Sequence, residues 1–580
     1  MTQEVCYWYL CFVPPETTTT IAPKIFGFAE FITALALLIV LYTIVDIRYR
    51  FRLSIAPGAL HPVTFALIAI IGAVSLLSEV WIFQGWWLPK TVGLSKAIWQ
   101  ALFGALFLSM SLTWIYYAFI SPPVFCKRNA KRFAQGLYHV VLKGNEAELA
   151  IIANELSRSA IPLVKYSRRL QPRFSYKDKV SEQDNKRKKP EVGDYAHDLL
   201  LLIANRKLCR HIVESSPVTA LAIFESMSNE KKYDIPIGQF AKNVSTEAIA
   251  NKDSILYHEG SGFSSGLIGY LKPWSQTIYG NFDLIEALAV NFGSPLDIDY
   301  RARWSWDAEQ WKAYCRAISV AFAGFLTSGK SNIHSYAIFR AIHDVEDAFR
   351  DVYKLNEIGN ELPKNDIYER LDVVVSFVTE AISLIDKQMT LPQVTELRRR
   401  DYNKEEDIYD LLADLMFKIL FSASSVPGPP DKCWAIHYNA TWSRFFDFMS
   451  KRKAVKIVQF KLRRLLYNEV ARMTKMPNYK GARILGLLLN VMGTEVSTGK
   501  DGFGREYKPL AKAVHAWTKR SYLKIYDDLP DVAEAVLIGG ISYDANERRL
   551  VKTYLKGLSK EASCQYLNLD HSLVSDIPLG

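Results

Sequence analysis

The segment GFLTSGKS at 324–331 matches the G-x-x-x-x-G-K-[ST] pattern of a phosphate-binding loop. In such a loop, backbone N–H groups surround the phosphates, the lysine pairs with the terminal phosphates and the hydroxyl residue holds Mg²⁺. The match raises the hypothesis of a nucleotide hydrolase with nucleotide and magnesium as cofactors. Its binding residues would be Gly324, Gly329, Lys330 and Ser331.

The sequence around this match predicts a different structure. A phosphate loop connects a buried strand to a helix, whereas the apolar residues in 311–326 recur at helical spacing. Gly329 suits the left-handed position after a helix end, and Ser331 or Asn332 can cap a following helix. No aspartate suited to magnesium follows a hydrophobic strand. The sequence therefore favours a helix–turn–helix junction at 324–331, with nucleotide hydrolysis as the alternative.

Other patterns that could support chemistry are weaker. His343 and Asp347 stand four residues apart and could share a metal on one helix face, but a charged solvated face explains them equally well. The seven cysteines include no C-x-x-C pair, which argues against a zinc site. The sequence thus predicts neither a catalytic set nor a metal site, and it favours a protein that is not an enzyme.

Three apolar segments near the N-terminus are long enough to cross a bilayer as helices: 25–47, 62–83 and 97–120. Within lipid every backbone polar group must be paired, so such segments must be helical. Buried helices of a soluble core explain three closely spaced segments of this length less well. We therefore expect a three-helix transmembrane domain.

Basic residues indicate how these helices are oriented. Arg48, Arg50 and Arg52 follow the first segment and a basic cluster at 127–132 follows the third, whereas the tail and the second loop contain few cations. Because basic loops stay in the cytosol, we expect the N-terminus outside and residues 121–580 inside. This pattern is typical of a multi-pass protein of the plasma (inner) membrane.

The third segment carries a stripe of small residues that lets helices approach closely. Two interpretations fit it: packing against the other two spans of the same chain, or self-association. Self-association would also allow an oligomeric pore or effector. The stripe consists of Ala97, Ala101, Gly104, Ala105 and Ser109.

The rest of the chain shows helical periodicity and little strand-like alternation, so the predicted fold class is mainly α, with a large irregular all-helical cytosolic region. Gly144 separates two amphipathic helices, the second capped by Asn145. The predicted organisation is a tail at 1–24, the membrane domain at 25–120, a juxtamembrane helical hairpin at 121–164, a basic linker at 165–190 and a helical domain at 191–580, which forms two units if it breaks near 424–432.

The chain carries a formal charge of +11, nearly all of it after residue 120. Two basic segments are candidates for contact with anionic lipid or nucleic acid, although a solvated linker and a half-buried helix explain them as well. The first contains Lys186, Arg187, Lys188 and Lys189, and the second contains Lys451, Arg452, Lys453, Lys456, Lys461, Arg463 and Arg464.

Taken together, these patterns predict a membrane-anchored cytosolic interaction module: a receptor, scaffold or effector at the inner face of the membrane. The expected partners are the lipid bilayer and either another protein or a second copy of the chain. The alternatives are the membrane-tethered nucleotide hydrolase and the oligomeric pore.

Overall fold

A computed structural model of the chain contains two compact units, Met1–Pro236 and Ile237–Gly580. The boundary between them lies inside the predicted domain 191–580, at a point that no sequence pattern marks. The described residues are mainly helical, with three small sheets. They are 5–7, 10–13, 26–44, 46–57, 60–84, 86, 88–89, 96–170, 190–259, 263–265, 269–271, 274–290, 293–330, 334–359, 361–388, 391–397, 406–447, 452–495, 506–554 and 563–570.

Two helices of the first unit are long and apolar enough to cross a membrane, over Pro62–Trp81 and Ile98–Ile120. The first lies in α3 (Leu60–Phe83), and the second joins α4 (Lys96–Ile115) to the π-helix η2 (Tyr116–Ile120). These two helices support association with a membrane. They are fewer than the three spans predicted.

The predicted first span, 25–47, is not one helix. Helix α1 covers Phe28–Ile44 and has 17 residues, which at about 1.5 Å per residue gives roughly 26 Å, against about 30 Å of hydrocarbon. Asp46 is extended, with a ψ of 150°, and directly precedes α2 (Ile47–Ser54). A hydropathy average over 25–47 does not detect this break, because Asp46 is a single polar residue between the apolar Val45 and Ile47.

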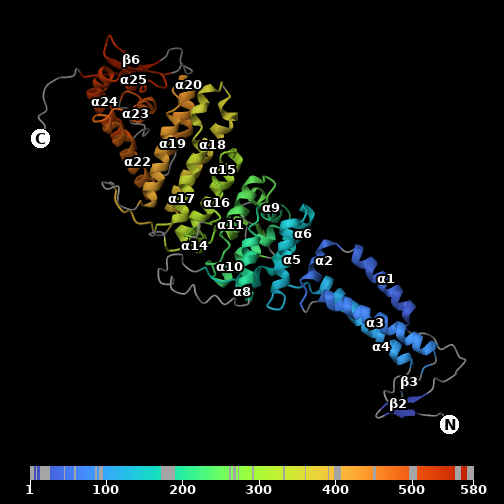
Figure 1. Ribbon diagram of the computed structural model, residues 1–580. Helices are drawn as coiled ribbons and strands as arrows, with labels where there is room; N and C mark the ends of the chain where they lie inside the picture. The colour runs from blue at the N-terminus through green and yellow to red at the C-terminus, as the bar shows by residue number, and fades with distance from the viewer. Residues whose placement is uncertain are drawn as a thin grey trace, which may run out of the picture. The chain divides into compact units, whose positions relative to one another are not determined.

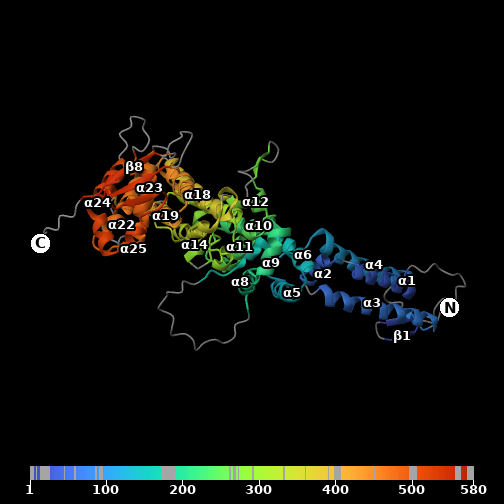
Figure 2. The same ribbon diagram turned by 90° about the horizontal axis from the view of Figure 1, so that it is seen from above.

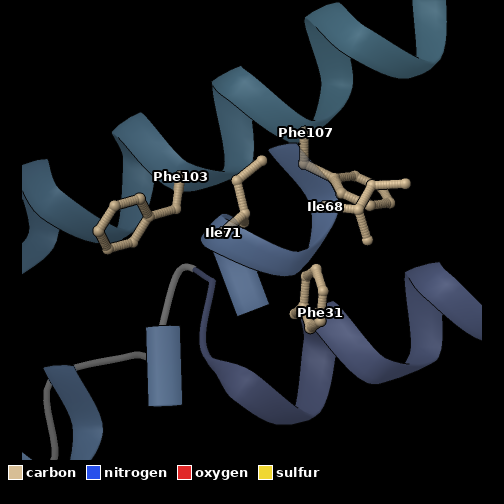
Figure 3. Close-up of a cluster of buried hydrophobic side chains, with 5 residues drawn as sticks. All are labelled: Phe31, Ile68, Ile71, Phe103 and Phe107. Carbon is tan, nitrogen blue, oxygen red and sulfur yellow. The ribbon is translucent and has the colours of Figure 1, made fainter. Parts of the chain in front are cut away.

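The three apolar helices share a small core. Figure 3 shows Phe31 of α1 beside Ile68 and Ile71 of α3 and Phe107 of α4. The rings of Phe31 and Phe107 meet edge to face at 5.9 Å. This packing places α1 against α3 and α4. Figures 1 and 2 show the three helices together at the N-terminal end of the chain.

The two acidic side chains within these helices have a structural role at the start of α1. Glu30 accepts a hydrogen bond from the backbone N–H of Gly27, and Glu79 of α3 accepts one from Phe28. Carboxylates are favourable beside the positive end of a helix. These contacts give both acidic side chains a structural role, so their presence in apolar helices does not require a pathway for ions.

Short strands connect the N-terminal tail to the loop between α3 and α4. Strand β2 (Leu10–Val13) pairs antiparallel with β1 (Val5–Tyr7) on one side and with β3 (Leu88–Pro89) on the other. The tail and this loop therefore lie at the same end of the three helices.

The remainder of the first unit is helical. Asn145 caps the start of α6, as expected from the sequence, and forms a reciprocal capping box with Glu148. Residues 192–215 form two helices and not one, because the Asn205 side chain accepts hydrogen bonds from the backbone N–H groups of Lys207 and Leu208 and so starts a second helix. The elements are α5 (Ala130–Lys143), α6 (Glu146–Leu156), η3 (Ser157–Ser159), α7 (Ala160–Tyr166), α8 (Val192–Leu202), α9 (Arg206–Ser215) and α10 (Pro217–Glu230).

The second unit is built around four long helices that pack in the order α16, α18, α19, α22 (Figure 1). These are Ala308–Thr327, Asp366–Asp386, Ile408–Ala423 and Lys453–Arg472. The other helical elements are α11 (Gly238–Ala250), α12 (Ile255–His258), α13 (Trp274–Tyr279), α14 (Phe282–Val290), α15 (Tyr300–Arg303), α17 (Tyr336–Asp344), η4 (Val345–Phe349), η5 (Val352–Glu357), η6 (Leu362–Lys364), α20 (Pro430–Cys433), η7 (Trp434–Trp442), α21 (Ser443–Phe446), α23 (Tyr479–Met492), α24 (Lys508–Asp528) and α25 (Pro530–Glu534).

The prediction of an all-helical body was wrong. Strands β6 (Ile541–Asp544), β7 (Arg549–Thr553) and β8 (Cys564–Asn568) form an antiparallel meander near the C-terminus. A hairpin of β4 (Phe263–Ser265) and β5 (Gly269–Leu271) adds a second small sheet to this unit. Strands of three to five residues are too short for alternation to stand out from the surrounding helical pattern.

A buried polar cluster joins this meander to the helices. Lys552 of β7 donates hydrogen bonds to the side-chain oxygen of Asn490 and to the carbonyl of Gly539. The Asn490 amide nitrogen lies 3.0 Å from Nδ1 of His437, whose Nε2 lies 3.0 Å from the carbonyl of Ala423. Burial lowers the pKa of Lys552 to about 8 and that of His437 to about 4.

Candidate functional site

A buried arginine joins the end of the membrane helices to the helical body of the first unit. Arg52 of α2 forms a bidentate ion pair with Glu155 of α6, with N···O distances of 2.9 and 2.6 Å. Its third nitrogen donates to the carbonyl of Ala118 in η2, at 2.8 Å. Both charged side chains are buried. The arginine that the sequence marked only by its charge thus connects three elements.

Further contacts surround this junction. The side chain of Asn129 donates to the carbonyls of Ile55 and Val124, both at 2.9 Å. Phe51 meets Phe133 of α5 edge to face. The first loop therefore lies beside the segment that follows η2.

The second unit contains a large open groove of about 1240 Å³, here called the α15–α23 groove. Its wall runs from α15 through α17 and η4 to α19 and finally α23. Salt bridges and stacking between neighbouring elements establish this order, as described below. The residues that line it and carry the argument are Tyr300, Arg303, Trp304, His343, Asp344, Glu346, Asp347, Arg350, Tyr353, Asp414, Phe417, Lys418, Phe421, Lys480 and Arg483.

At one end of the groove, Arg303 connects α15 to η4. Its buried guanidinium pairs with Asp344 and with Asp347, the latter at 3.3 Å. Arg350 contacts Asp347 from the exposed side. Burial raises the pKa of Asp344, although Arg303 opposes the shift. These ion pairs hold Arg303, Asp344 and Asp347 together in the groove lining, which also includes Tyr300.

In the middle of the groove, Lys418 of α19 reaches Glu346 and Asp414, each at 2.7 Å. Glu346 also lies 3.1 Å from Nδ1 of His343, and this hydrogen bond raises the pKa of the histidine. Burial alone would raise the pKa of Glu346, but its hydrogen bonds to His343 and Lys418 lower it. Every groove carboxylate described here is therefore already paired with a cation.

At the other end, α23 contributes two exposed cations. The Lys480 ammonium lies 4.9 Å from the ring centre of Phe417 and 5.7 Å from that of Phe421, and 3.7 Å from Glu469. Arg483 is exposed one turn further along the helix. The arrangement offers paired charges, aromatic faces and exposed cations, which suits binding of a ligand better than acid–base chemistry.

Three of the residues matching a phosphate loop lie where the helix–turn interpretation places them. Gly324 is inside α16, packed against the backbone of Gly280, and Gly329 has a φ of +72° after the end of that helix. Lys330 pairs with Asp283 at 2.7 Å on the surface. Ser331 lies outside the described residues. The helix presents its negative C-terminal end to this turn, the opposite of what a phosphate requires.

The candidate metal pair does not converge. His343 faces Glu346, whereas Asp347 faces Arg303 and Arg350. Across the described residues, no three His, Cys, Asp or Glu side chains are grouped to hold a metal ion.

The predicted basic helix is α22, and it is half-buried. Lys461 belongs to the core: its ammonium contacts Asp407 at 3.2 Å and Asp410 at 2.6 Å, and only 4% of its side chain is exposed. Arg463 is half-buried and donates to the carbonyl of Glu506. The exposed cations are Arg452, Lys453, Lys456 and Arg464, whereas Lys451 and Lys186, Arg187, Lys188 and Lys189 lie outside the described residues.

The small-residue stripe of α4 does not pack against α1 and α3. Ala101, Ala105 and Ser109 are exposed in the isolated chain, whereas Phe103 and Phe107 face the other helices. Only Gly104 makes a close approach, to Phe26, and the side chain of Ala97 lies outside the described set.

Apart from His343 and Asp347, the groove residues were not singled out from the sequence. Tyr300 and Trp304 fall in a short segment without apolar periodicity. This absence of periodicity is a sign that their rings are not part of the buried core. The other wall residues come from helices far apart in the sequence. No protein-family model, no curated protein and no solved structure matches this chain.

Proposed function

We propose that the protein is a membrane-anchored interaction module: α1, α3 and α4 cross the plasma (inner) membrane, the N-terminus lies outside, and residues 121–580 form a cytosolic body that binds a protein partner. The observation that carries this proposal is the Arg52–Glu155–Ala118 junction, which fastens the membrane helices to the helical part of the first unit that follows them.

The contacts at the two ends of the helices support three crossings. Pairing of β2 with β3 puts the N-terminal tail beside the loop after α3. The contacts of Arg52 and Asn129 put the loop after α1 beside the segment after η2. A chain with both features runs from one side to the other three times. Helix α1, at 17 residues, is at the lower limit for spanning hydrocarbon.

Cysteine labelling in cells that express the full chain tests this topology. Cys564 is exposed on β8 and lies in the proposed cytosolic body. A membrane-impermeant maleimide should label it only after the cells are permeabilised, with Cys564→Ser identifying the signal. An epitope placed before residue 1 should bind antibody on intact cells. Labelling of Cys564 in intact cells would refute the orientation.

Purification in mild detergent tests the interaction role. A stoichiometric protein partner should accompany the full-length chain, and substitutions in the α15–α23 groove identify whether that groove holds it. A chain that purifies alone under every condition tested would argue against an interaction module.

Self-association is a second candidate role, favoured by the exposure of Ala101, Ala105 and Ser109 on α4. Small residues on a lipid-facing surface permit close helix–helix contact. Ala105→Leu should then lower the yield of chemically cross-linked dimer in membranes, and Leu106→Ala, at an exposed neighbouring position, should not. Equal yields for all three chains would exclude this face.

A further inference from the structure

We infer that the α15–α23 groove binds an acidic peptide segment that carries an aromatic or large apolar residue at one end and carboxylates at the other. This inference rests on the proposed function and names the partner chemistry of the same body. The argument follows the groove from its aromatic end to its basic end.

The aromatic end exposes two large rings. Trp304 and Tyr300 have 63% and 49% of their surface accessible, and Tyr353, 51% accessible, also lines the groove. The rings of Tyr300 and Trp304 meet edge to face at 5.5 Å, which holds them as one platform. Exposed tryptophan and tyrosine are the residue types that most often anchor protein interfaces, because they bury a large area with few rotatable bonds.

The middle of the groove has little net charge to offer a ligand. Arg303 and Arg350 neutralise Asp344 and Asp347, and Lys418 lies between Glu346 and Asp414. These pairs form a fixed polar floor that can exchange hydrogen bonds with a peptide backbone.

The basic end has positive charge in excess. Lys480 rests on the rings of Phe417 and Phe421 and has Glu469 at 3.7 Å, while Arg483 is exposed beside it. Stacking on the two rings holds the Lys480 stem in place and leaves the ammonium at the surface of the groove. Carboxylates of a ligand would meet these two cations.

The dimensions and charge of the groove favour a peptide over a nucleic acid. A volume of about 1240 Å³ exceeds the roughly 300–1,000 Å³ of a small-molecule pocket and accommodates several residues. A nucleic acid carries a phosphate at every nucleotide, and the cations in the middle of the groove are already paired with carboxylates and cannot neutralise those phosphates. A peptide can place its acidic residues at the α23 end alone.

Selection from random dodecapeptides displayed on phage tests the inference, with the full-length protein in lipid nanodiscs as the target. Lys480→Glu combined with Arg483→Glu reverses both cations of the basic end. Arg472→Glu combined with Lys475→Glu is the matched control, because these exposed residues lie just before α23, outside the groove lining, and the charge change is equal. A fluorescent oligo-dT of 20 nucleotides provides the nucleic-acid comparison.

The enriched peptides should contain more Asp and Glu than the starting library, grouped to one side of an aromatic residue. Their affinity should fall about tenfold or more in the groove variant and in Trp304→Ala, which is the usual range for an interface anchor. The control variant should bind as the wild type does.

Three results would overturn the inference: no enrichment, enrichment without acidic residues, or equal loss of binding in the groove and control variants. Oligo-dT binding that is lost in the groove variant would also overturn it, in favour of a nucleic-acid site. A protein partner that co-purifies equally well with the groove variant would exclude this groove while leaving the interaction module intact.

Discussion

His437 provides a direct test of the buried cluster between η7, α23 and β7. The ring is fully buried, and the carbonyl of Ala423 can only accept a hydrogen bond, so Nε2 carries the proton. The Asn490 oxygen accepts from Lys552, which turns its amide N–H groups toward Nδ1 of His437. A second proton on the ring would therefore face a donor, in a buried site near an ammonium group.

The predicted effect is a loss of stability in acid. Burial lowers the pKa of His437 from 6.5 to about 4 in the folded protein. Because the pKa of His437 is lower in the folded protein, the unfolded chain binds the proton first as the pH falls. The contribution of His437 to the stability of the folded protein is therefore complete above pH 6.5 and decreases as the pH drops toward 4. Between pH 7 and pH 4 the free energy of unfolding should fall by about 3 kcal/mol through this group.

Urea unfolding of the purified protein in detergent, followed by tryptophan fluorescence at several pH values, measures this loss of stability. Because His437→Gln removes the titrating group, the free energy of unfolding of the wild type minus that of the variant reports on His437 and not on the other titrating groups. This difference in free energy should shrink by about 3 kcal/mol from pH 7 to pH 4. His139→Gln, at an exposed position on α5, is the control for a histidine substitution that leaves the buried cluster intact. A His437→Gln difference that is constant with pH would refute the assigned environment.

Three further substitutions test other parts of the structure. Arg52→Gln leaves the buried Glu155 carboxylate with only Arg48, whose Nε lies 3.5 Å away, and should lower stability by about 3 kcal/mol, seen as a lower thermal midpoint in detergent; an unchanged midpoint would contradict the junction. Lys461→Met should cost a similar amount because two carboxylates lose their partner, whereas Lys456→Met, exposed on the same helix, should change stability by less than about 0.5 kcal/mol. Gly324→Ala adds a methyl carbon that overlaps the carbonyl oxygen of Gly280, so it should destabilise the fold by about 1–3 kcal/mol. It should not alter the binding of a fluorescent ATP analogue, and loss of saturable nucleotide binding with unchanged stability would favour a phosphate loop.

The sequence predicts a helix well where the residues that start it, or the apolar periodicity along it, are all present within the segment. Asn145 and Glu148 specify the start of α6 within four residues, and the periodicity of 311–326 identifies α16 ahead of the turn at Gly329. In each case the residues that decide the conformation are neighbours in the chain, so the pattern contains the cause.

Features that depend on distant residues could not be predicted in the same way. The burial of Arg52 requires Glu155, 103 residues later, and nothing near Arg52 distinguishes it from a cation facing lipid headgroups. Small-residue spacing identified the stripe on α4, but which face of that helix meets α1 is decided by the large residues Phe103 and Phe107.

The groove depends even more on tertiary structure. Its walls come from four regions of the second unit, and Trp304 and Arg483 become parts of one surface only through the pairs that join α15, η4, α19 and α23. The composition shows that the chain after residue 120 is basic, but it does not show which cations lack enough neighbouring carboxylates to neutralise them.

The distance along the chain between Arg52 and Glu155 also has a consequence for biosynthesis. A ribosome that adds about 5–20 residues per second needs roughly 5–20 s to make the 103 residues that separate them. During this interval both long apolar helices have been made while the arginine still has no carboxylate to meet. The two long apolar helices are therefore complete before the carboxylate that pairs with Arg52 has been made, so this ion pair forms as a separate, later event in the maturation of each molecule.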